Sequence, residues 1–345
     1  MQDKAVPNLI ITGAAGFIGS SLVDTLCSQY PAQKLILVDN FNDYYSPQWK
    51  REFLKKALQE NKDRIVLLEQ DISRRPEELC EVFKKALAKL NESDFSDWTM
   101  VHLAAKAGVR PSVAVPYSYA QTNTLGTLSI LETCRTLGIE KLINASSSSV
   151  YGRHSSVPFS EDKLVSIPQS PYAASKLAAE IFCQNYSELH SLKCISLRFF
   201  TVYGPRQRPD LAIHKFTRKI LASQPIDIYG DGSTARDYTY IDEIVSGVIN
   251  AIVLIQTRHE EKGFHEVINL GSSRPITLAD LVKTLEEVIG LKAKLDYKPL
   301  PDEDVIVTFA NVDKARRLLD YSPSLPFNEG IKRFYEWYKE WQNQN

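Results

Sequence analysis

The chain has 345 residues, with 41 Lys and Arg against 42 Asp and Glu, which gives a formal net charge of −1. This length exceeds one minimal domain and fits a large α/β unit with a smaller lobe. The balanced charge and the lack of a basic stripe argue against nucleic acid or a membrane surface as a partner. No run of about 18 apolar residues is present, so no transmembrane helix is predicted.

The cysteines and histidines do not have the spacing of a disulfide framework or a metal site. Five cysteines occur, none in a CxxC pair, and the six histidines form no HxxxH pair. We therefore expect reduced, mostly buried thiols and no metal. Residues 1–7 lack the apolar core of a signal peptide, which favours a cytoplasmic protein.

In the first part of the chain, short apolar runs alternate with helix-length segments. The runs predict strands at Asn8–Thr12, Lys34–Val38, Arg64–Leu68, Thr99–Leu103, Lys141–Ala145 and Cys194–Phe199. Helices are expected at Ser46–Glu60, Pro76–Leu90, Tyr117–Leu137 and Pro171–His190. This alternation predicts a Rossmann-type, doubly wound parallel sheet with helices on both faces, over residues 1–200.

After about Phe200 the pattern changes, because prolines and glycines divide the chain into short, mixed elements. Helices are expected at Ile213–Ala222, Ile241–Leu254, Leu278–Ile289 and Glu329–Asn343. We interpret residues 201–345 mainly as a smaller mixed α/β lobe that binds substrate, with some chain crossing back to the first domain. No flexible linker separates the two parts, so the cleft between them is the predicted active site.

The first predicted strand leads into a glycine-rich turn, Gly13-Ala-Ala-Gly16-Phe-Ile-Gly19, and then a helix. Gly13 permits a tight turn, Gly16 lets a pyrophosphate approach the backbone, and Gly19 allows the helix to pack closely on the strand. The spacing is GxxGxxG rather than GxGxxG, so the position between strand and helix carries the interpretation. Phe17 and Ile18 belong to the same predicted cofactor site.

Asp39 stands 20 residues after Gly19, at the end of the second predicted strand. A carboxylate there accepts hydrogen bonds from ribose hydroxyls and repels a 2′-phosphate, which favours NAD over NADP. Alternatively, Asp39 only caps a turn. Further cofactor contacts are expected near other strand ends, at Asn40, Asp71, Ile72, Leu103, Ala104 and Ala105. Asn123, on a predicted helix, either orders these strand ends or is simply solvated.

Tyr172 and Lys176 stand four residues apart, on one face of a predicted helix. An ammonium group beside a phenol lowers the phenol pKa from about 10, and a phenolate poised nearer neutrality can take a proton from a sugar hydroxyl. Lys176 can also hold the nicotinamide ribose. A YxxxK pair alone is typical of a solvated helix face. Here it follows a serine run, residues 146–149, at the end of the fifth strand, where such folds bind ligands.

Together these motifs resemble the extended short-chain dehydrogenase/reductase family, specifically its NAD-dependent nucleotide-sugar epimerases. The resemblance covers essentially the whole chain and rests on the glycine turn and on residues 146–152, 171–176 and 230–242. It implies that Tyr172 is the acid/base catalyst, that Lys176 lowers its pKa, and that Ser147 is the third catalytic residue. It also implies that Lys215, Tyr229 and Arg236 bind a UDP-sugar, with Arg236 on the diphosphate.

Residues 197–216 and 39–45 are similar to the UDP-glucuronate 4-epimerase subgroup. UDP-glucose/galactose epimerases have an Asn at the position of Thr201. The resemblance implies that Thr201 and Arg208 hold the sugar carboxylate, with Ser148 and Ser149 completing the cage. Alternatively, Arg208 lies on the surface or pairs with the diphosphate, and its neighbour Arg206 is a second candidate for the carboxylate.

The expected reaction is NAD-dependent 4-epimerisation of UDP-glucuronate to UDP-galacturonate through a 4-keto sugar. An epimerase of a neutral or N-acetylated UDP-hexose, a UDP-glucuronate decarboxylase and a catalytically silent NAD-binding protein remain alternatives. A homodimer is expected, because relatives pair the helices that correspond to 117–137 and 171–190. Two features depart from the pattern: Glu303 replaces the usual Gly, and the segment Arg74–Asp97 is longer than expected.

Overall fold

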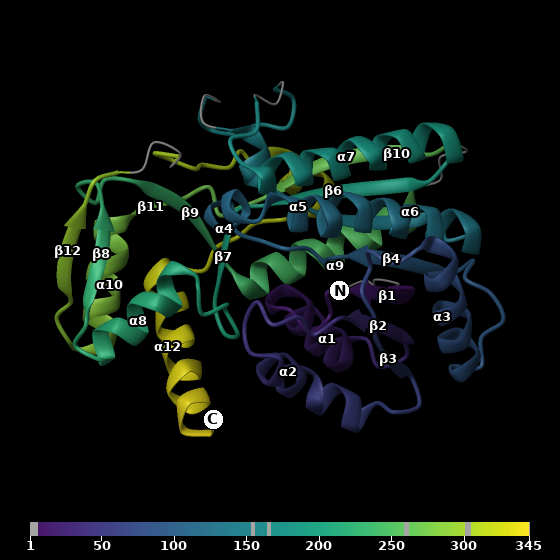
Figure 1. The fold of residues 1–345 in the computed structure, drawn as a ribbon, viewed down its shortest axis with the longest axis horizontal. Coiled ribbons are helices and arrows are strands. Elements are labelled where there is room, and N and C mark those ends of the chain that lie inside the picture. Colours follow the sequence, from purple (N-terminus) through teal and green to yellow (C-terminus); the bar gives the residue numbers. More distant parts are fainter. Residues whose placement is uncertain (1–5, 153–155, 164–166, 259–261, 301–304, 345) are drawn as a thin grey trace.

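A computed structural model of the chain describes residues 6–152, 156–163, 167–258, 262–300 and 305–344 (Figure 1). Its central sheet has seven parallel strands in the order β10-β6-β5-β4-β1-β2-β3. Their bounds are β1 Asn8–Thr12, β2 Leu35–Asp39, β3 Ile65–Glu69, β4 Trp98–His102, β5 Lys141–Ser147, β6 Lys193–Phe199 and β10 Phe264–Leu270. The predicted Rossmann-type parallel sheet is confirmed, and the six strands predicted for it lie within two residues of their expected ends.

Helices cover both faces of this sheet, as buried parallel strands require. One face carries α3 (Pro76–Lys89), α6 (Gly126–Leu137) and α7 (Pro171–His190). The other carries α1 (Phe17–Gln29), α2 (Pro47–Glu60), α9 (Ile241–Thr257) and α11 (Asp313–Leu319). Successive residues of β1 serve opposite faces: Leu9 and Ile11 pack with α1, whereas Ile10 packs with α3 and α6. The segment Arg74–Asp97 thus contains α3, one of the covering helices.

The smaller lobe contains the two remaining sheets and lies to the left in Figure 1. The three-stranded sheet has β7 (Thr201–Tyr203), β9 (Ala235–Tyr240) and β11 (Pro275–Thr277), and the two-stranded sheet has β8 (Pro225–Tyr229) and β12 (Lys294–Lys298). Its helices are α8 (Ala212–Leu221), α10 (Leu278–Ile289) and α12 (Phe327–Gln344). The helices of this lobe were expected, but the strands after residue 200 were not.

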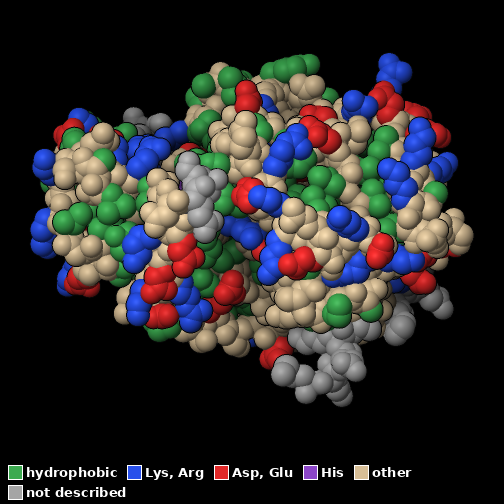
Figure 2. Space-filling model, turned by 90° about the horizontal axis from the view of Figure 1, so that it is seen from below, with side chains coloured by type: hydrophobic (Ala, Val, Ile, Leu, Met, Phe, Trp, Pro, Cys, Tyr) green, Lys and Arg blue, Asp and Glu red, His purple; other side chains and the backbone are tan. Residues whose placement is uncertain are grey.

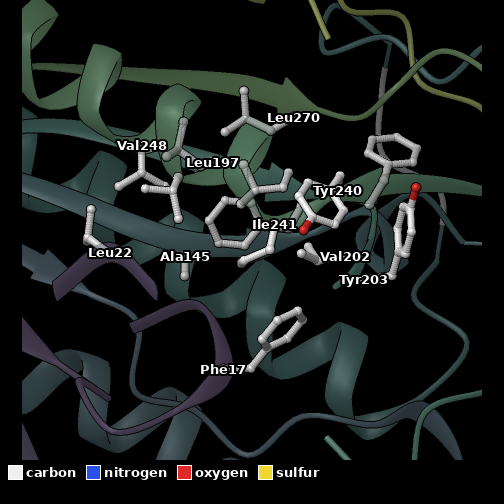
Figure 3. Packing of buried hydrophobic residues seen from close by; sticks show 14 of the residues in the cluster. Phe17, Leu22, Ala145, Leu197, Val202, Tyr203, Tyr240, Ile241, Val248 and Leu270 are labelled. Carbon is white, nitrogen blue, oxygen red and sulfur yellow. The ribbon is translucent and has the colours of Figure 1, made fainter. Parts of the chain in front are cut away.

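One hydrophobic core runs from beneath the parallel sheet into the smaller lobe. Leu22 of α1 and Val248 of α9 lie at one end of the view in Figure 3, and Tyr203 and Tyr240 lie at the other. The chain also returns from the lobe to the large sheet, because α9 packs beside α1 and β10 pairs with β6. The two parts are therefore interlocked rather than joined by a linker.

The single helix predicted over Tyr117–Leu137 is wrong in its first part. Helix α4 (Val109–Ala114) comes first, then a short α5 (Pro116–Tyr119), a π-helical turn η1 (Ala120–Leu125) and α6. Within the turn the Asn123 carbonyl accepts a hydrogen bond of 2.6 Å from the Thr127 hydroxyl, while the Asn123 side chain bonds the backbone of Lys106. Contacts to a distant segment thus accompany the wider turn, a feature frequent at functional sites.

Charged side chains of both signs are interspersed over the face shown in Figure 2, with no large area of one sign. All five cysteines are free, and all but Cys27 are buried. No helix within the described residues is long and apolar enough to cross a membrane.

Candidate active site

A cleft opens at the carboxyl ends of the parallel strands and brings together many residues predicted from the sequence. Those that line it are Gly13, Gly16, Phe17, Ile18, Gly19, Asp39, Asn40, Ile72, Leu103, Ala104, Ala105, Tyr172, Lys176 and Arg208. They come from the end of β2, from the first turns of α1 and α7, and from the loops that follow β1, β2, β3, β4 and β7. Parallel α/β sheets bind ligands at this edge, so the fold itself brings these distant segments together.

The glycine turn leaves no room for side chains. Gly13 has a φ of +70°, and a Cβ built on it would lie 2.7 Å from the backbone nitrogen of Ala104. A Cβ on Gly19 would lie 2.1 Å from the Gly13 carbonyl oxygen, so only glycine fits where α1 passes the turn. Gly16 is the N-cap of α1, and no side chain there accepts from the free N–H groups of the first turn. This open helix end fits the pyrophosphate of a dinucleotide.

Asp39 is 8% exposed and lines the cleft at the end of β2. One carboxylate oxygen accepts from the N–H of Ala15 at 3.0 Å and the other from that of Phe41 at 2.8 Å. Burial raises the pKa of Asp39 in spite of these hydrogen bonds and the nearby charge of Lys50. The turn-capping alternative is therefore part of the structure, and the carboxylate oxygens keep further lone pairs for ribose hydroxyls.

Asn123 and Asp71 are held behind the cleft wall. Asn123 is 1% exposed, which rules out the solvated alternative, and its amide nitrogen donates to Ser175 of α7 at 2.9 Å. Together with its bonds to Lys106, this contact ties the loop after β4 to the helix that carries Tyr172. Asp71 accepts from the Asn40 side chain at 2.8 Å and so orients a residue that does line the cleft.

Helix α7 begins at a well-formed cap. The Ser170 hydroxyl oxygen accepts from the N–H of Ala173 at 3.1 Å, and Pro171 occupies the first helical position. Tyr172 and Lys176 follow in the first turns and both line the cleft. The Lys176 ammonium donates to the carbonyl oxygen of Ala145 at 2.7 Å, so its place against β5 is fixed.

The titration of Tyr172 differs from the expectation. Burial raises the pKa of Tyr172, and a hydrogen bond with Ser147 and the positive charge of Arg208 oppose this rise. Burial likewise lowers the pKa of Lys176 to about 8, against the pull of the Glu180 charge. Lys176 is not among the groups that shift the pKa of Tyr172, so the predicted lowering of that pKa by Lys176 is not found. Desolvation outweighs the attraction of nearby charges for both groups.

Arg208 and Arg206, the two candidates for the carboxylate, point to different places. Arg206 donates to Asp24 of α1 at 2.5 Å and its guanidinium carbon lies 5.3 Å from the Phe53 ring centroid. Arg208 instead lines the cleft, near enough to Tyr172 for its charge to act on the phenol. Its guanidinium is bound by Asp210 through two hydrogen bonds of 2.9 Å. Of the two arginines, Arg208 is therefore the one that lines the cleft.

The serine run caps a short 3₁₀ turn, η2 (Ser148–Tyr151), after β5. The Ser147 hydroxyl donates to Ser149 at 3.1 Å and accepts from the Ser149 N–H at 3.2 Å. Ser146, which was not assigned a role, lines the cleft, and its hydroxyl donates to Glu180 of the buried Glu180–Arg198 ion pair. Ser147, Ser148 and Ser149 are not among the residues that line the cleft.

Four predicted substrate contacts also lie outside this cleft lining: Thr201, Lys215, Tyr229 and Arg236. Thr201 begins β7, and Lys215 of α8 lies 3.9 Å from Asp227. Arg236 of β9 donates to the Ala235 carbonyl at 2.9 Å. The Tyr229 ring of β8 meets Arg110 of α4, whose guanidinium carbon lies 4.4 Å from the ring centroid. The last contact joins the smaller lobe to the Rossmann domain. Glu303 lies outside the described residues.

Several residues of the cleft were missed by sequence reasoning, namely Asn42, Tyr44, Tyr45, Lys50, Gln70 and Lys106. The Tyr45 hydroxyl is buried without a hydrogen-bond partner within the described residues. Tyr44 donates to Asp210 at 3.3 Å. The segment 39–45 carried a subgroup resemblance, but nothing in it indicated that its tyrosines would meet the loop at Arg208.

The fold and cleft define a dinucleotide-binding enzyme of the extended short-chain dehydrogenase/reductase type. The chain belongs to the GDP-mannose 4,6 dehydratase family, whose sequence profile matches residues 10–334. A UDP-glucuronate 4-epimerase from Thermodesulfobacterium geofontis is 38% identical over 335 residues, covering 96% of each chain.

Solved structures of nucleotide-sugar 4-epimerases are also similar to this chain. A Bacillus cereus UDP-glucuronic acid 4-epimerase, in complex with UDP-glucuronic acid and NAD, aligns with a TM-score of 0.84 at 32% identity, over 97% of this chain and 99% of that one. A UDP-glucose 4-epimerase from Thermotoga maritima, with UDP-glucose, aligns with a TM-score of 0.81 at 31% identity, over 97% and 99%. The similarity of fold therefore does not choose between acidic and neutral sugars, and the choice depends on individual residues.

Proposed function

We propose that the chain is an NAD-dependent UDP-glucuronate 4-epimerase that interconverts UDP-glucuronate and UDP-galacturonate. The observation that carries this proposal is the position of Arg208, which places a guanidinium in the same cleft as Tyr172 and within electrostatic reach of its phenol. A neutral hexose gives such a cation no partner at the sugar, whereas a hexuronate does. The identity to the Thermodesulfobacterium geofontis epimerase supports the same assignment.

The residues of the cleft suit NAD. The glycine turn and the open first turn of α1 would receive the pyrophosphate, and Asp39 with Asn40 would receive the adenosine ribose. Leu103, Ala104 and Ala105 offer small or apolar walls for close passage of the cofactor. When bound, NAD would accept a hydride from C4 of the sugar and return it, so that no net redox change occurs.

Tyr172 is the group that moves the C4 hydroxyl proton in this proposal. Its phenol oxygen would take that proton as the sugar is oxidised and give it back as the ketone is reduced. The hydrogen bond with Ser147 and the charge of Arg208 both lower the pKa of Tyr172, and they oppose the effect of burial. Lys176, fixed to the Ala145 carbonyl, would hold the nicotinamide ribose beside Tyr172.

Arg208 would also protect the intermediate. Oxidation of glucuronate at C4 gives a ketone β to the C5 carboxylate, and such an acid loses CO2 when its carboxylate bond aligns with the ketone π system. A guanidinium can hold the carboxylate out of that alignment by paired hydrogen bonds. We place Thr201, Ser148 and Ser149 around the same carboxylate. Lys215, Tyr229 and Arg236 of the lobe from residue 201 onward would bind the UDP portion.

Two alternative reactions share this machinery. An epimerase of neutral or N-acetylated UDP-hexoses would use the same Ser147, Tyr172 and Lys176, and a UDP-glucuronate decarboxylase would share the first oxidation. Arg208 in the cleft argues against the former. Binding of the sugar carboxylate by Arg208 argues against the decarboxylase, because decarboxylation requires the carboxylate bond to align with the ketone π system and this binding prevents that alignment.

The direct test is incubation of the NAD-loaded protein with UDP-glucuronate and separation of the products. We expect UDP-galacturonate, no accumulation of a UDP-pentose, and slower or no reaction with UDP-glucose. In Tyr172→Phe the turnover should fall by about 10²–10⁴-fold while bound NAD is retained. A wild type that prefers UDP-glucose would move the protein to the neutral-sugar epimerases, and a UDP-pentose as the main product would move it to the decarboxylases.

We further infer a cytoplasmic homodimer. The five free thiols suit a reducing compartment. Apolar side chains on α5, η1 and α7 are strongly exposed in the single chain, among them Tyr117 at 80% and Leu189 at 73%. These elements contact one another, and α5 and α7 lie side by side in Figure 1. A second copy that covered them across a two-fold axis would remove this apolar surface from water.

A further inference from the structure

Asp210 occupies the guanidinium of Arg208 in the structure. The Arg208 Nε donates to Oδ1 and Nη2 donates to Oδ2, both at 2.9 Å, so one edge of the guanidinium plane is fully used. The Tyr44 hydroxyl, from the loop after β2, donates to the same Asp210 at 3.3 Å. Arg208 is 18% exposed and Asp210 38%, so the pair lies at the wall of the cleft rather than inside the core.

An internal carboxylate on this guanidinium matters for the proposed reaction. In 4-epimerisation the keto sugar must turn between the two hydride transfers, because hydride returns to the opposite face of C4. A carboxylate held by Arg208 must therefore leave the guanidinium during the turn. An arginine left without any anion in a mostly buried position is strongly disfavoured, whereas one that keeps a carboxylate partner is not.

We propose that Asp210 is a positioning residue that acts as an exchangeable counter-ion. It pairs with Arg208 again whenever the sugar carboxylate leaves the guanidinium. This inference rests on the proposed UDP-glucuronate epimerisation. Asp210 weakens the hold on the bound substrate and lowers the cost of turning the keto sugar. Its effect is thus opposite on substrate affinity and on turnover.

Two observations support the exchange. Burial works against ionisation of Asp210, yet the hydrogen bonds and charge of Arg208 hold its pKa below the ordinary value, so a charged competitor is present at neutral pH. The Tyr44 hydroxyl gives the Asp210 carboxylate a second donor. Asp210 therefore keeps a hydrogen bond when Arg208 turns to a ligand, and neither charge is left bare.

The test is Asp210→Asn, which keeps the shape and removes the charge, in the NAD-loaded enzyme. With UDP-glucuronate we expect KM to fall about two- to fivefold, the range of a partly exposed ion pair, and kcat to fall as well. Calorimetric titration in a Tyr172→Phe background, where turnover is suppressed, should give a Kd for UDP-glucuronate lowered to a similar extent. The Kd for UDP-glucose should not change. Asp313→Asn, which removes the carboxylate of the exposed Asp313–Arg316 pair on α11, is the matched control and should change none of these values.

A merely orienting role for Asp210 predicts the opposite, because loss of the partner would disorder Arg208. An unchanged or raised KM and Kd in Asp210→Asn would overturn the inference while the wild type still epimerises UDP-glucuronate. A wild type that does not epimerise it would refute the proposed function first. If Asp210→Asn does not retain NAD, Asp210→Ala with added formate replaces it. There, formate should raise KM toward the wild-type value, and no response to formate would overturn the inference.

Discussion

Lys176 is only 6% exposed, yet the proposed chemistry requires its ammonium group beside Tyr172. Burial lowers its pKa from 10.5 to about 8. Below pH 8 the folded protein carries this charge at a cost. Between pH 8 and 10.5 the unfolded chain binds the proton and the folded protein does not, so the stability contributed by this site rises with pH.

We therefore predict that Lys176→Met is more stable than the wild type at neutral pH while its turnover is abolished. The advantage should shrink as the pH rises from 8 to 10.5, by on the order of 3 kcal/mol. Urea unfolding of both nucleotide-free proteins at pH 7 and pH 10 measures it. A stability difference that is constant with pH would show that the pKa of Lys176 is not lowered in the folded protein.

Arg208 and Arg206 provide a matched pair of variants, because they stand two residues apart and pair with different carboxylates. Arg208→Ala should lower kcat/KM for UDP-glucuronate and UDP-galacturonate. The corresponding loss of transition-state stabilisation should be about 2 kcal/mol, the lower end of the range for a broken charge pair, because Asp210 already shares the guanidinium. Any activity on UDP-glucose should be spared, and a UDP-pentose by-product should increase. Arg206→Ala breaks the pair with Asp24 instead, and should lower stability without changing the ratio between acidic and neutral sugars. An equal loss on both sugars in Arg208→Ala would assign Arg208 to the diphosphate or the fold.

The residues that sequence reasoning placed in the cleft are those marked by local patterns. Glycine spacing located Gly13 and Gly19, and the YxxxK pair located Tyr172 and Lys176. Tyr44 and Asp210 had no such mark, because their role depends on the contact of two loops far apart in the chain. The direction of the Tyr172 pKa shift was predicted wrongly for the same reason. The YxxxK spacing suggests that Lys176 lowers the pKa, but burial by the surrounding fold raises it.

At the scale of whole elements, six of the seven strands of the large sheet were predictable because buried parallel strands form mostly apolar runs, whereas β10, which contains His265 and Glu266, was not expected. The strands of the smaller lobe were not. β7 and β11 have three residues each, and β12 is exposed at four of its five positions. Leu295 and Tyr297 alternate with charged residues in β12, but the alternation spans only five residues and both apolar side chains are exposed, so no strand was inferred there.

The π-helical turn η1 escaped prediction because its cause is not local. Residues 117–137 keep a helical pattern, whereas Asn123 meets the backbone of Lys106 and the hydroxyl of Ser175. Asn123→Ala would remove the partner of the Lys106 N–H and carbonyl groups and one of the two hydrogen bonds of the Ser175 hydroxyl, which still donates to the Tyr172 carbonyl. We predict a loss of about 1–3 kcal/mol in the free energy of unfolding and weaker retention of NAD. Gln121→Ala, at an exposed position of the same turn, should change neither; urea unfolding and nucleotide content measure both variants. Equal effects of Asn123→Ala and Gln121→Ala would mean that the hydrogen bonds of the Asn123 side chain do not stabilise the turn.

At the scale of the molecule, the chain after residue 200 is required by the domain before it. β10 supplies the seventh strand beside β6, and α9 covers β5 and β6. The hydrophobic core continues into the lobe through residues such as Tyr203 and Tyr240. Because the core is shared, the walls of the cleft belong to one packed unit, and Arg208 lines the same cleft as Tyr172.

The exposed apolar surface over α5, η1 and α7 gives the last prediction. Leu125 and Ile181 are each 54% exposed, and a second copy that covers them would bury them on both sides of a two-fold axis. We expect light scattering at micromolar concentration to give about twice the chain mass of 39.0 kDa. Ile181→Glu should bury two charges without partners in the interface and shift the mass to that of one chain. Tyr297→Glu, at a 60% exposed position on β12 of the smaller lobe, should remain a dimer. A wild type of monomer mass, or equal dissociation by both variants, would refute this interface.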